Sequence, residues 1–266
     1  MPLQPVAARA ALHFWEEPCI SGQKGSGTVF FTGCNLDCAF CQNYEVSHLK
    51  KGKPITYGRL ADIFRELEAK GAHNINLVSP SHYVGAIIRA LDIYKPKIPV
   101  VYNSGGYDTP ENIRALKDYA DIFLMDLKYL SPDRAKKYSG AENYPEYAVS
   151  AVKQAYLQQP ECVFKNGIMQ KGVIVRHLLL PLGTREAIAV FDWVRENTPG
   201  VYFSIMSQYT PCGRAEQYPE INRRVTKREY EKVLSYICNT DFENVYIQEK
   251  TSSDKKFIPP FDLAGV

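Results

Sequence analysis

Short apolar runs rich in β-branched residues alternate with amphipathic stretches along most of this 266-residue chain. The runs that we interpret as strands lie at 27–32, 74–78, 98–102, 121–127, 172–180, 201–206 and 244–248. Strands separated by helices pair in parallel through right-handed crossovers. Six or seven such units are too few for a closed eight-stranded barrel. The alternation therefore predicts an α/β fold with a mainly parallel sheet curved into a partial, open barrel.

Capping residues mark several helix starts between these strands. Thr56 precedes a stretch to Lys70 in which apolar residues recur at helical spacing. Thr109-Pro110 and Ser131-Pro132 combine a capping residue with proline at the first helical position. The remaining helices are expected at 83–94, after a cap at Thr184, and at 226–238.

One domain is the simplest organisation, since no linker, repeat or low-complexity tract divides the chain. We expect an N-terminal extension at 1–26, a barrel core at 27–212, and a C-terminal helix, strand and tail at 213–266. The net charge of +3 does not favour nucleic-acid binding. No apolar run approaches the ~18 residues of a membrane span, and the first residues lack a signal pattern. These observations predict a cytoplasmic protein that binds neither nucleic acid nor membrane.

Three cysteines follow the first expected strand in one short loop. Their spacing, Cys34-x3-Cys38-x2-Cys41, allows the loop to hold three corners of a [4Fe–4S] cube. No fourth cysteine stands near them in the sequence, so one iron would keep an open coordination position. An open position is typical of a catalytic metal site, because a substrate or cofactor can bind the metal directly.

The motif resembles the signature of the radical SAM superfamily. In that family S-adenosylmethionine (SAM) binds the free iron through its amino and carboxylate groups, and an electron from the cluster cleaves it to a 5′-deoxyadenosyl radical. The resemblance implies a partial (β/α)6 barrel, a [4Fe–4S] cluster on Cys34, Cys38 and Cys41, SAM, and a flavodoxin- or ferredoxin-type electron donor. It also implies that Phe40, just before the third cysteine, lies beside the adenine.

A structural zinc site is the alternative for the same loop. Cys34, Cys38 and Cys41 could join His48 in a Cys3His site, because thiolates and imidazole suit zinc equally well. Zinc sites are more often built from two Cys-x2-Cys pairs on separate loops, and this chain lacks them.

Polar residues follow the second and third expected strands, where the working residues of such sheets stand. Ser79-Pro80-Ser81-His82 occupies the place of the superfamily's Gly-Gly-Glu-Pro-like turn, which holds the amino group of SAM. No acidic residue is present, so Ser79, Ser81 and His82 are the candidates for that contact. His82 equally fits a residue that caps the next helix. Asn103-Ser104-Gly105-Gly106-Tyr107 resembles the Asp-Thr-Asn-Gly turn of glycyl-radical-enzyme activases, with Asn103 and Ser104 in the first two positions.

The fourth strand ends in Asp126-Leu127-Lys128, which matches the Asp-Leu-Lys motif of the same activases. Alternation along a strand places Asp126 and Lys128 on one face. The pair could order SAM, bind a monovalent cation together with Asn103, or form an ordinary structural ion pair.

The fifth and sixth strands complete the candidate set. Of Arg176 and His177, the resemblance favours Arg176 facing inward to hold the carboxylate or ribose of SAM. His177 is expected to be packed or to face solvent. After the sixth strand, Gln208 and Tyr209 are expected to line the adenine.

Four cysteines outside the motif are too scattered for a second cluster. Cys162 and Cys238 are expected to be small buried hydrophobes. Cys19 stays unassigned, and Cys212, just after the sixth-strand turn, is a candidate catalytic hydrogen donor.

Over nearly its whole length the chain resembles the PflX branch of proteins similar to pyruvate formate-lyase activating enzyme. The segments that carry this resemblance are the N-terminal signature at 17–43, and 103–107, 126–128, 138–139 and 176–177. It implies hydrogen abstraction from a backbone glycine of a glycyl radical enzyme, whose peptide loop would enter the open side of the barrel. The alternatives are radical modification of another small-molecule or peptide substrate, and a non-catalytic zinc module. A zinc module would more naturally fill the inward positions of the barrel with apolar side chains.

Overall fold

A computed structural model describes residues 4–247 and 259–266 of the chain. Seven strands pair in parallel, in the order in which they follow one another around the sheet. They are β2 (Ser26–Phe31), β4 (Ile75–Val78), β5 (Val100–Ser104), β6 (Ile122–Asp126), β8 (Ile168–Leu178), β9 (Tyr202–Met206) and β10 (Val245–Ile247). The predicted α/β class and mainly parallel sheet are confirmed.

Three antiparallel strands, which the sequence did not predict, extend this sheet. β1 (Val6–His13) pairs with β2, β3 (Lys53–Pro54) pairs with β1, and β7 (Val163–Lys165) forms a hairpin with β8. β1 has the sequence Val-Ala-Ala-Arg-Ala-Ala-Leu-His, and alanine has little preference for strands. Its conformation comes from pairing with β2, so the expected N-terminal extension is in part an element of the sheet.

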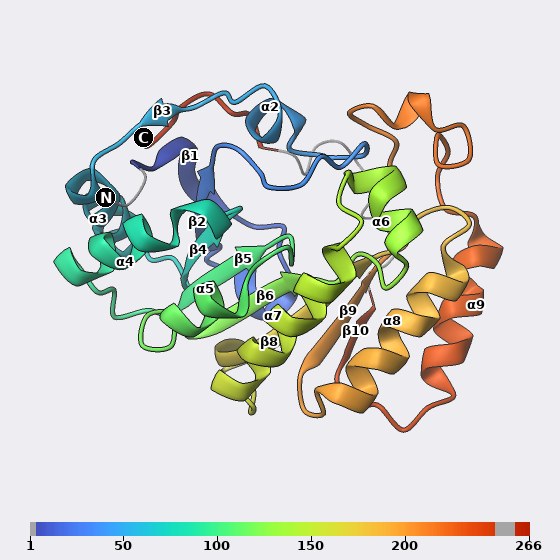
Figure 1. The fold of residues 1–266 in the computed structure, drawn as a ribbon. Coiled ribbons are helices and arrows are strands. Elements are labelled where there is room, and N and C mark those ends of the chain that lie inside the picture. The colour runs from blue at the N-terminus through green and yellow to red at the C-terminus, as the bar shows by residue number, and fades with distance from the viewer. Residues whose placement is uncertain (1–3, 248–258) are drawn as a thin grey trace.

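Helices surround the outer face of the curved sheet (Figure 1). The longer ones are α3 (Tyr57–Ala69), α4 (Val84–Ile93), α5 (Pro110–Ala115), α6 (Pro132–Ser139), α7 (Tyr144–Gln158), α8 (Thr184–Asn197) and α9 (Lys227–Cys238). Short turns of helix are α1 (Pro18–Ser21), α2 (Tyr44–Ser47), η1 (Ser81–Tyr83) and η2 (Ala215–Gln217). Together with the sheet they build the apolar core between the two layers.

Local capping signals predicted most helix starts correctly. The expected caps Thr56, Thr109 and Ser131 each accept a hydrogen bond from the backbone three residues later, and Thr226, which was not expected as a cap, does the same. The expected cap at Thr184 is wrong, because Gly183 holds the N-cap position and Thr184 is the first helical residue.

The sheet is an open barrel. Its terminal strands, β3 and β10, lie at opposite ends of the strand order and are not paired with each other within the described residues. Residues 259–266 lie against β1, where the Ala10 N–H donates to the Ala264 carbonyl at 2.8 Å. Phe261 packs on Phe30 with ring centroids 5.5 Å apart. Throughout the described ranges, every helix is too short or too polar to cross a membrane.

Candidate active site

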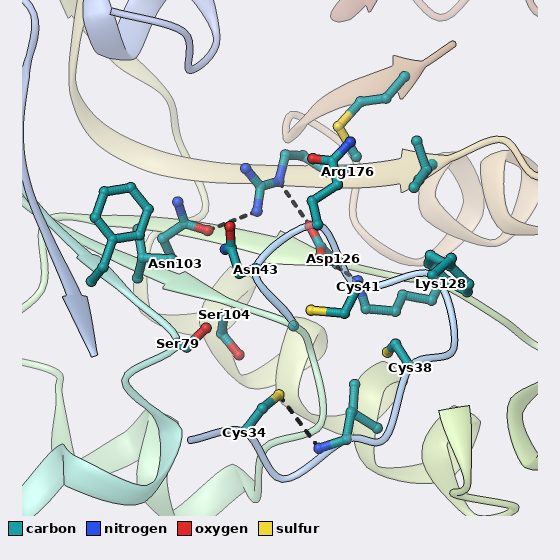
Figure 2. Close-up of a pocket in the computed structure, with 18 of the residues that line it drawn as sticks. Cys34, Cys38, Cys41, Asn43, Ser79, Asn103, Ser104, Asp126, Lys128 and Arg176 are labelled. Atoms are coloured by element: carbon teal, nitrogen blue, oxygen red, sulfur yellow. Dashed lines mark hydrogen bonds and ion pairs between the residues drawn. The ribbon is translucent and has the colours of Figure 1, made fainter. Parts of the chain in front are cut away.

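A pocket of about 290 Å³ lies at the carboxyl ends of the parallel strands. Its walls come from the loop after β2, from the ends of β4, β5, β6, β8 and β9, and from the segment that follows β1 (Figure 2). Most of the predicted site residues line it, namely Cys34, Cys38, Phe40, Cys41, Ser79, Ser81, His82, Asn103, Ser104, Asp126, Lys128, Arg176, Gln208 and Cys212. The topology therefore brings together residues from six strands at one edge of the sheet, as parallel pairing requires.

The three motif cysteines share this pocket. Cys38 is buried, Cys41 is half-buried, and Cys34 is exposed but packed closely enough by protein atoms that burial raises the pKa of its thiol to about 11. Burial, followed by the charges of Cys38 and Cys34, raises the pKa of Cys41 to about 12. Ser139 donates a hydrogen bond to the Cys38 sulfur at 3.1 Å. Three thiols that resist ionisation become thiolates together only if they bind a strong positive charge such as a metal centre.

Arg176 is the centre of a buried ionic network in the same pocket. Its Nε lies 2.8 Å from Asp126 Oδ1, its Nη2 donates to Asn103 Oδ1 at 2.7 Å, and its Nη1 lies 3.1 Å from Glu16 Oε2. Lys128 Nζ contacts the other oxygen of Asp126 at 2.5 Å. Figure 2 shows Arg176, Asp126 and Lys128 arranged along the side of the pocket that faces Cys41.

Mutual attraction outweighs desolvation for these charged groups. Burial disfavours the charged form of Asp126, but the adjacent Arg176 and Lys128 hold its pKa below the usual value. Burial likewise opposes the charge of Lys128, but Asp126 keeps the pKa of the ammonium above its ordinary range. Two cationic heads therefore stand fixed in the pocket, close to the position of the cysteines. The predicted inward orientation of Arg176 is found, and His177 is buried with Nδ1 2.8 Å from the Leu127 carbonyl.

Two acidic residues of this network were not predicted from the sequence. Glu16 accepts hydrogen bonds from Asn103 and Asn76, at 3.1 and 3.2 Å, and pairs with Arg176. Glu17 is only 3% exposed, and its Oε2 lies 3.9 Å from Arg176. Burial raises the pKa of Glu17, and Arg176 opposes that shift. The detectable signal was a pair of adjacent acidic residues at the end of an otherwise apolar stretch.

A second wall of the pocket carries hydroxyl groups. Ser81 Oγ donates to Asp108 Oδ2 at 3.0 Å, and Ser104 Oγ donates to the same oxygen. Ser79 has a φ of +57°, which is rare for a residue other than glycine, and its N–H donates to the Asn103 carbonyl at 3.0 Å. His82 Nε2 is bonded to the Thr32 carbonyl at 3.0 Å, so that ring nitrogen is already engaged.

The remaining wall combines aromatic and sulfur-bearing side chains. Phe40 lines the pocket, and Tyr209 packs behind it with ring centroids 5.9 Å apart. Tyr209 is buried and donates to the Ile221 carbonyl at 2.8 Å, so it supports Phe40 from outside the pocket, whereas Gln208 lines the pocket directly. Cys212 donates to the Phe40 carbonyl at 3.1 Å and is also part of the wall.

The other cysteines lie away from this pocket. Cys238 is exposed, so its predicted burial is wrong; it lies at the last position of α9 on the solvent side. Cys162 is half-buried and donates to the Val173 carbonyl at 3.7 Å. Cys19 is buried in α1.

Comparisons with known proteins bear on this geometry. The family model described as "Radical SAM superfamily" matches residues 28–173, which is more than half of the chain. The chain belongs to the radical SAM superfamily. This radical SAM protein is also 30% identical over 245 residues to the uncharacterized protein MJ0674 of Methanocaldococcus jannaschii, covering 88% of this chain and 68% of that protein.

Solved structures of the same fold are longer than this radical SAM protein. SuiB of Streptococcus suis bound to the precursor peptide SuiA aligns with a TM-score of 0.57 and 16% identity, over 82% of this chain and 47% of SuiB. The [FeFe]-hydrogenase maturase HydG of Carboxydothermus hydrogenoformans aligns with a TM-score of 0.53 and 13% identity, over 87% of this chain and 56% of HydG. The chain thus spans about half the length of these proteins, and the likeness shows the open-barrel fold.

Membership implies a [4Fe–4S] cluster and SAM, and the residues present fit both groups. Three cysteines of cluster spacing face one pocket, and cationic and hydroxyl-bearing walls flank them. A single zinc ion fits less well, because His48 is bonded to Asp37 and Ser47 at 2.8 and 2.7 Å. Among the residues that the structure describes, no group of three or more His, Cys, Asp or Glu side chains is placed to share one metal ion.

The monovalent cation stays a prediction. Cation binding was one of three alternatives for Asp126, Lys128 and Asn103, and in the structure Asn103 Oδ1 and both Asp126 oxygens are bonded to the Arg176 guanidinium and the Lys128 ammonium. These two side chains supply positive charge where a cation was expected.

Proposed function

We propose that this radical SAM protein cleaves SAM reductively and abstracts a hydrogen atom from a polypeptide substrate, in the manner of a glycyl-radical-enzyme activase. The observation that carries the proposal is the convergence of three cluster-type cysteines with the Asp126, Lys128 and Arg176 network in one pocket. The sequence resemblance to the PflX branch supports the activase-like form of the reaction. A flavodoxin- or ferredoxin-type protein in the cytoplasm is the electron donor that this chemistry requires.

Each wall of the pocket has a role in this proposal. When bound, the cluster and SAM supply an electron for sulfonium cleavage and the 5′-deoxyadenosyl radical. Lys128 and Arg176 provide fixed donors for the carboxylate of SAM, and Arg176 is held by Asp126 so that its planar fork keeps one orientation. Phe40, supported by Tyr209, offers an apolar face for adenine and excludes water from it.

A peptide substrate is favoured by the rim of the pocket. His13, Trp15 and Pro259 line the side that lies next to β1 and the returning 259–266 segment. Trp15 is 58% exposed and its neighbour Phe14 is 48% exposed, which is unusual for two consecutive aromatic residues beside a pocket. Large exposed aromatics of this kind give a peptide an apolar contact surface. The solved complex of SuiB with a precursor peptide lends support, since the fold is shared.

Anaerobic purification tests the radical SAM chemistry. We expect brown protein with about four irons per chain, as a cubane requires, and 5′-deoxyadenosine after reduction in the presence of SAM. The Cys38→Ala variant should lose the iron and the product. Colourless protein that binds one zinc ion would refute the proposal.

The substrate class is tested separately. The reduced holoenzyme is incubated with SAM and a candidate glycyl radical enzyme from the same genome, and electron paramagnetic resonance is used to look for a carbon-centred radical on that partner. A doublet on the partner supports activase function. Cleavage of SAM without any partner radical would favour the alternative, which is modification of another peptide or of a small molecule.

A further inference from the structure

The carboxyl-terminal end of α6 holds the cysteine loop from outside the pocket. The Asp37 N–H donates to the Ser139 carbonyl at 3.1 Å, and the Ala39 N–H donates to the Tyr138 carbonyl at 2.8 Å. These two main-chain bonds lie on either side of Cys38 in the sequence. Ser139 is 1% exposed and does not line the pocket, so its contact with the loop is closed to solvent.

A chain of two hydroxyl groups ends on the Cys38 sulfur. The Ser139 hydroxyl donates to Cys38 Sγ at 3.1 Å, although the two residues are 101 positions apart in the chain. A serine hydroxyl has a single hydrogen, and this bond uses it. Tyr129 Oη lies 3.1 Å from Ser139 Oγ, so the phenol is the donor in that second bond. Both O–H groups therefore point along the chain toward the sulfur.

Tyr129 is held firmly at the far end of this chain. It is 1% exposed, and its ring packs edge-on against Tyr144 with centroids 5.7 Å apart. Hydrogen bonds that follow one another in a buried, weakly screened environment polarise each other. Tyr129 therefore strengthens the bond that Ser139 gives to the sulfur.

The sulfurs of the other two motif cysteines have weaker donors. The Leu36 N–H lies 3.4 Å from Cys34 Sγ. Ser47 Oγ lies 3.2 Å from Cys41 Sγ, but it donates its hydrogen to the Asn43 carbonyl at 2.9 Å. Among the described residues, the buried hydroxyl at the end of α6 is thus the best-placed donor to a motif sulfur.

A hydrogen bond to a thiolate ligand favours the reduced form of an iron–sulfur cluster. Reduction adds negative charge that is shared by the sulfurs, so a donor aimed at one of them binds more strongly afterwards. Lys128 lies on the same side of the pocket as Cys38 (Figure 2) and acts in the same sense. Burial raises the pKa of the Cys38 thiol, and the Lys128 charge and the Ser139 bond both oppose that rise.

We propose that Ser139, polarised by Tyr129, is a positioning residue that raises the reduction potential of the cluster on the three motif cysteines. In the step concerned, the flavodoxin- or ferredoxin-type donor loses one electron and the cluster goes from [4Fe–4S]²⁺ to [4Fe–4S]⁺. The hydrogen of Ser139 stays on its oxygen throughout. The inference rests on the proposed function, because the cluster has to be reduced before SAM is cleaved.

The test is a redox titration of the anaerobic holoprotein without SAM, in which electron paramagnetic resonance follows the reduced cluster. Ser139→Ala removes the hydroxyl and leaves the main-chain bonds of the loop in place. We expect its equilibrium constant for reduction to fall about ten-fold, which is a potential about 59 mV more negative for one electron. Tyr129→Phe keeps the Ser139 hydroxyl but removes the group that polarises it. We expect a smaller shift in the same direction, about three-fold or about 28 mV.

Ser26→Ala is the matched control for the loss of a buried hydroxyl. Ser26 is fully buried like Ser139, and its hydroxyl donates to Asn74 Oδ1 at 2.6 Å at the start of β2, away from the pocket. Its potential should equal that of the wild type. If Ser139→Ala does not retain about four irons, Tyr129→Phe decides the matter, and an unchanged potential in that variant overturns the inference.

The outcomes separate this inference from the proposed function. A wild-type protein that holds no iron–sulfur cluster would overturn both. A cluster-loaded Ser139→Ala variant within about two-fold of the wild type, about 18 mV, would overturn the role of Ser139 alone. An equal shift in Ser26→Ala would also overturn it, since the potential would then respond to the loss of any buried hydroxyl. The expected shifts in a protein that does not cleave SAM would support the role of Ser139 and refute the proposed function.

Discussion

Replacement of Arg176 by methionine should destabilise this radical SAM protein more than the loss of any one hydrogen bond. Arg176 has a side chain that is 13% exposed, and it contacts Asp126, Glu16, Glu17 and Asn103 at 2.8, 3.1, 3.9 and 2.7 Å. Methionine fills a similar volume but carries no charge. Of the three carboxylates, only Asp126 would then keep a cationic partner, Lys128, while Glu16 would keep its hydrogen bonds from Asn76 and Asn103.

The size of the loss in the free energy of unfolding follows from the carboxylates that stay buried when Arg176 is removed. Removal of one partner from a buried ion pair costs about 3–5 kcal/mol, because the other charge stays buried without compensation. Arg176 serves three carboxylates, so we expect a loss near the upper end of this range in the free energy of unfolding. Arg65→Met is a suitable control. Its pair with Asp62 is more than half exposed on both sides, and such pairs contribute about 1 kcal/mol or less.

The loss should also depend on pH. Burial already raises the pKa of Glu17, and Arg176 is what opposes that shift. Without Arg176 the pKa of Glu17 in the folded protein rises further. A carboxyl group with a higher pKa in the folded than in the unfolded state takes up a proton on folding, so stability falls as pH rises. The deficit of Arg176→Met should therefore be larger at pH 8 than at pH 5, close to the ordinary pKa of a glutamate.

Urea unfolding of the anaerobic holoprotein, followed by circular dichroism at both pH values, measures this effect. The wild type and the Arg65→Met variant are titrated in parallel. A deficit below about 1 kcal/mol for Arg176→Met, comparable to that of an exposed pair, would refute the view that the network is tightly coupled and buried. A deficit that does not change between pH 5 and pH 8 would refute the assignment of Glu17 as the group left in excess.

Two further predictions concern the same end of the barrel. Burial lowers the pKa of His177 to about 4 from 6.5, so the unfolded chain binds a proton that the folded protein does not, and stability should fall between pH 6.5 and 4. At about 1.4 kcal/mol per pKa unit, the loss in the free energy of unfolding is about 3 kcal/mol. The His177→Gln variant should lack this pH-dependent loss when its urea midpoints are compared with those of the wild type. Identical pH profiles of the two proteins would contradict the prediction. Gly106→Ala should cost about 2 kcal/mol or more, because Gly106 has a φ of +84° and a Cβ would collide with the Asp126 carbonyl. Thermal unfolding measures that loss, and a midpoint within about 1 °C of the wild type would show that the turn can relax.

The parallel core of the fold was predictable because its signals are local. Thr56 and Thr109 cap their helices through bonds to residues three positions away, so a short stretch of sequence contains the whole motif. β1 was not predictable in this way. Its alanine-rich sequence has no strand preference of its own, and it becomes a strand through the register that begins with Ala7 opposite Phe31.

The residues of the candidate site likewise fall into those that the sequence could predict and those that it could not. Residues at strand ends, such as Asp126 and Arg176, could be placed from the alternation of strands and helices. Glu16 and Asp108 could not. Glu16 reaches the pocket only because β1 pairs with β2, and Asp108 reaches the serines of the pocket wall only because Gly106 reverses the chain. In both cases the decisive contact is made by backbone geometry that the side-chain pattern does not encode.

The pair between Glu16 and Arg176 joins residues 160 positions apart in the chain. Contacts of such long range form late, since the intervening loop must be closed before they stabilise anything. The cysteine loop emerges from the ribosome long before the strands that shield it, because β8 and β9 complete the pocket only after position 168. The pocket that shields the three thiols is therefore complete only once synthesis has passed β9, and a chain that is still being made holds them without that shield.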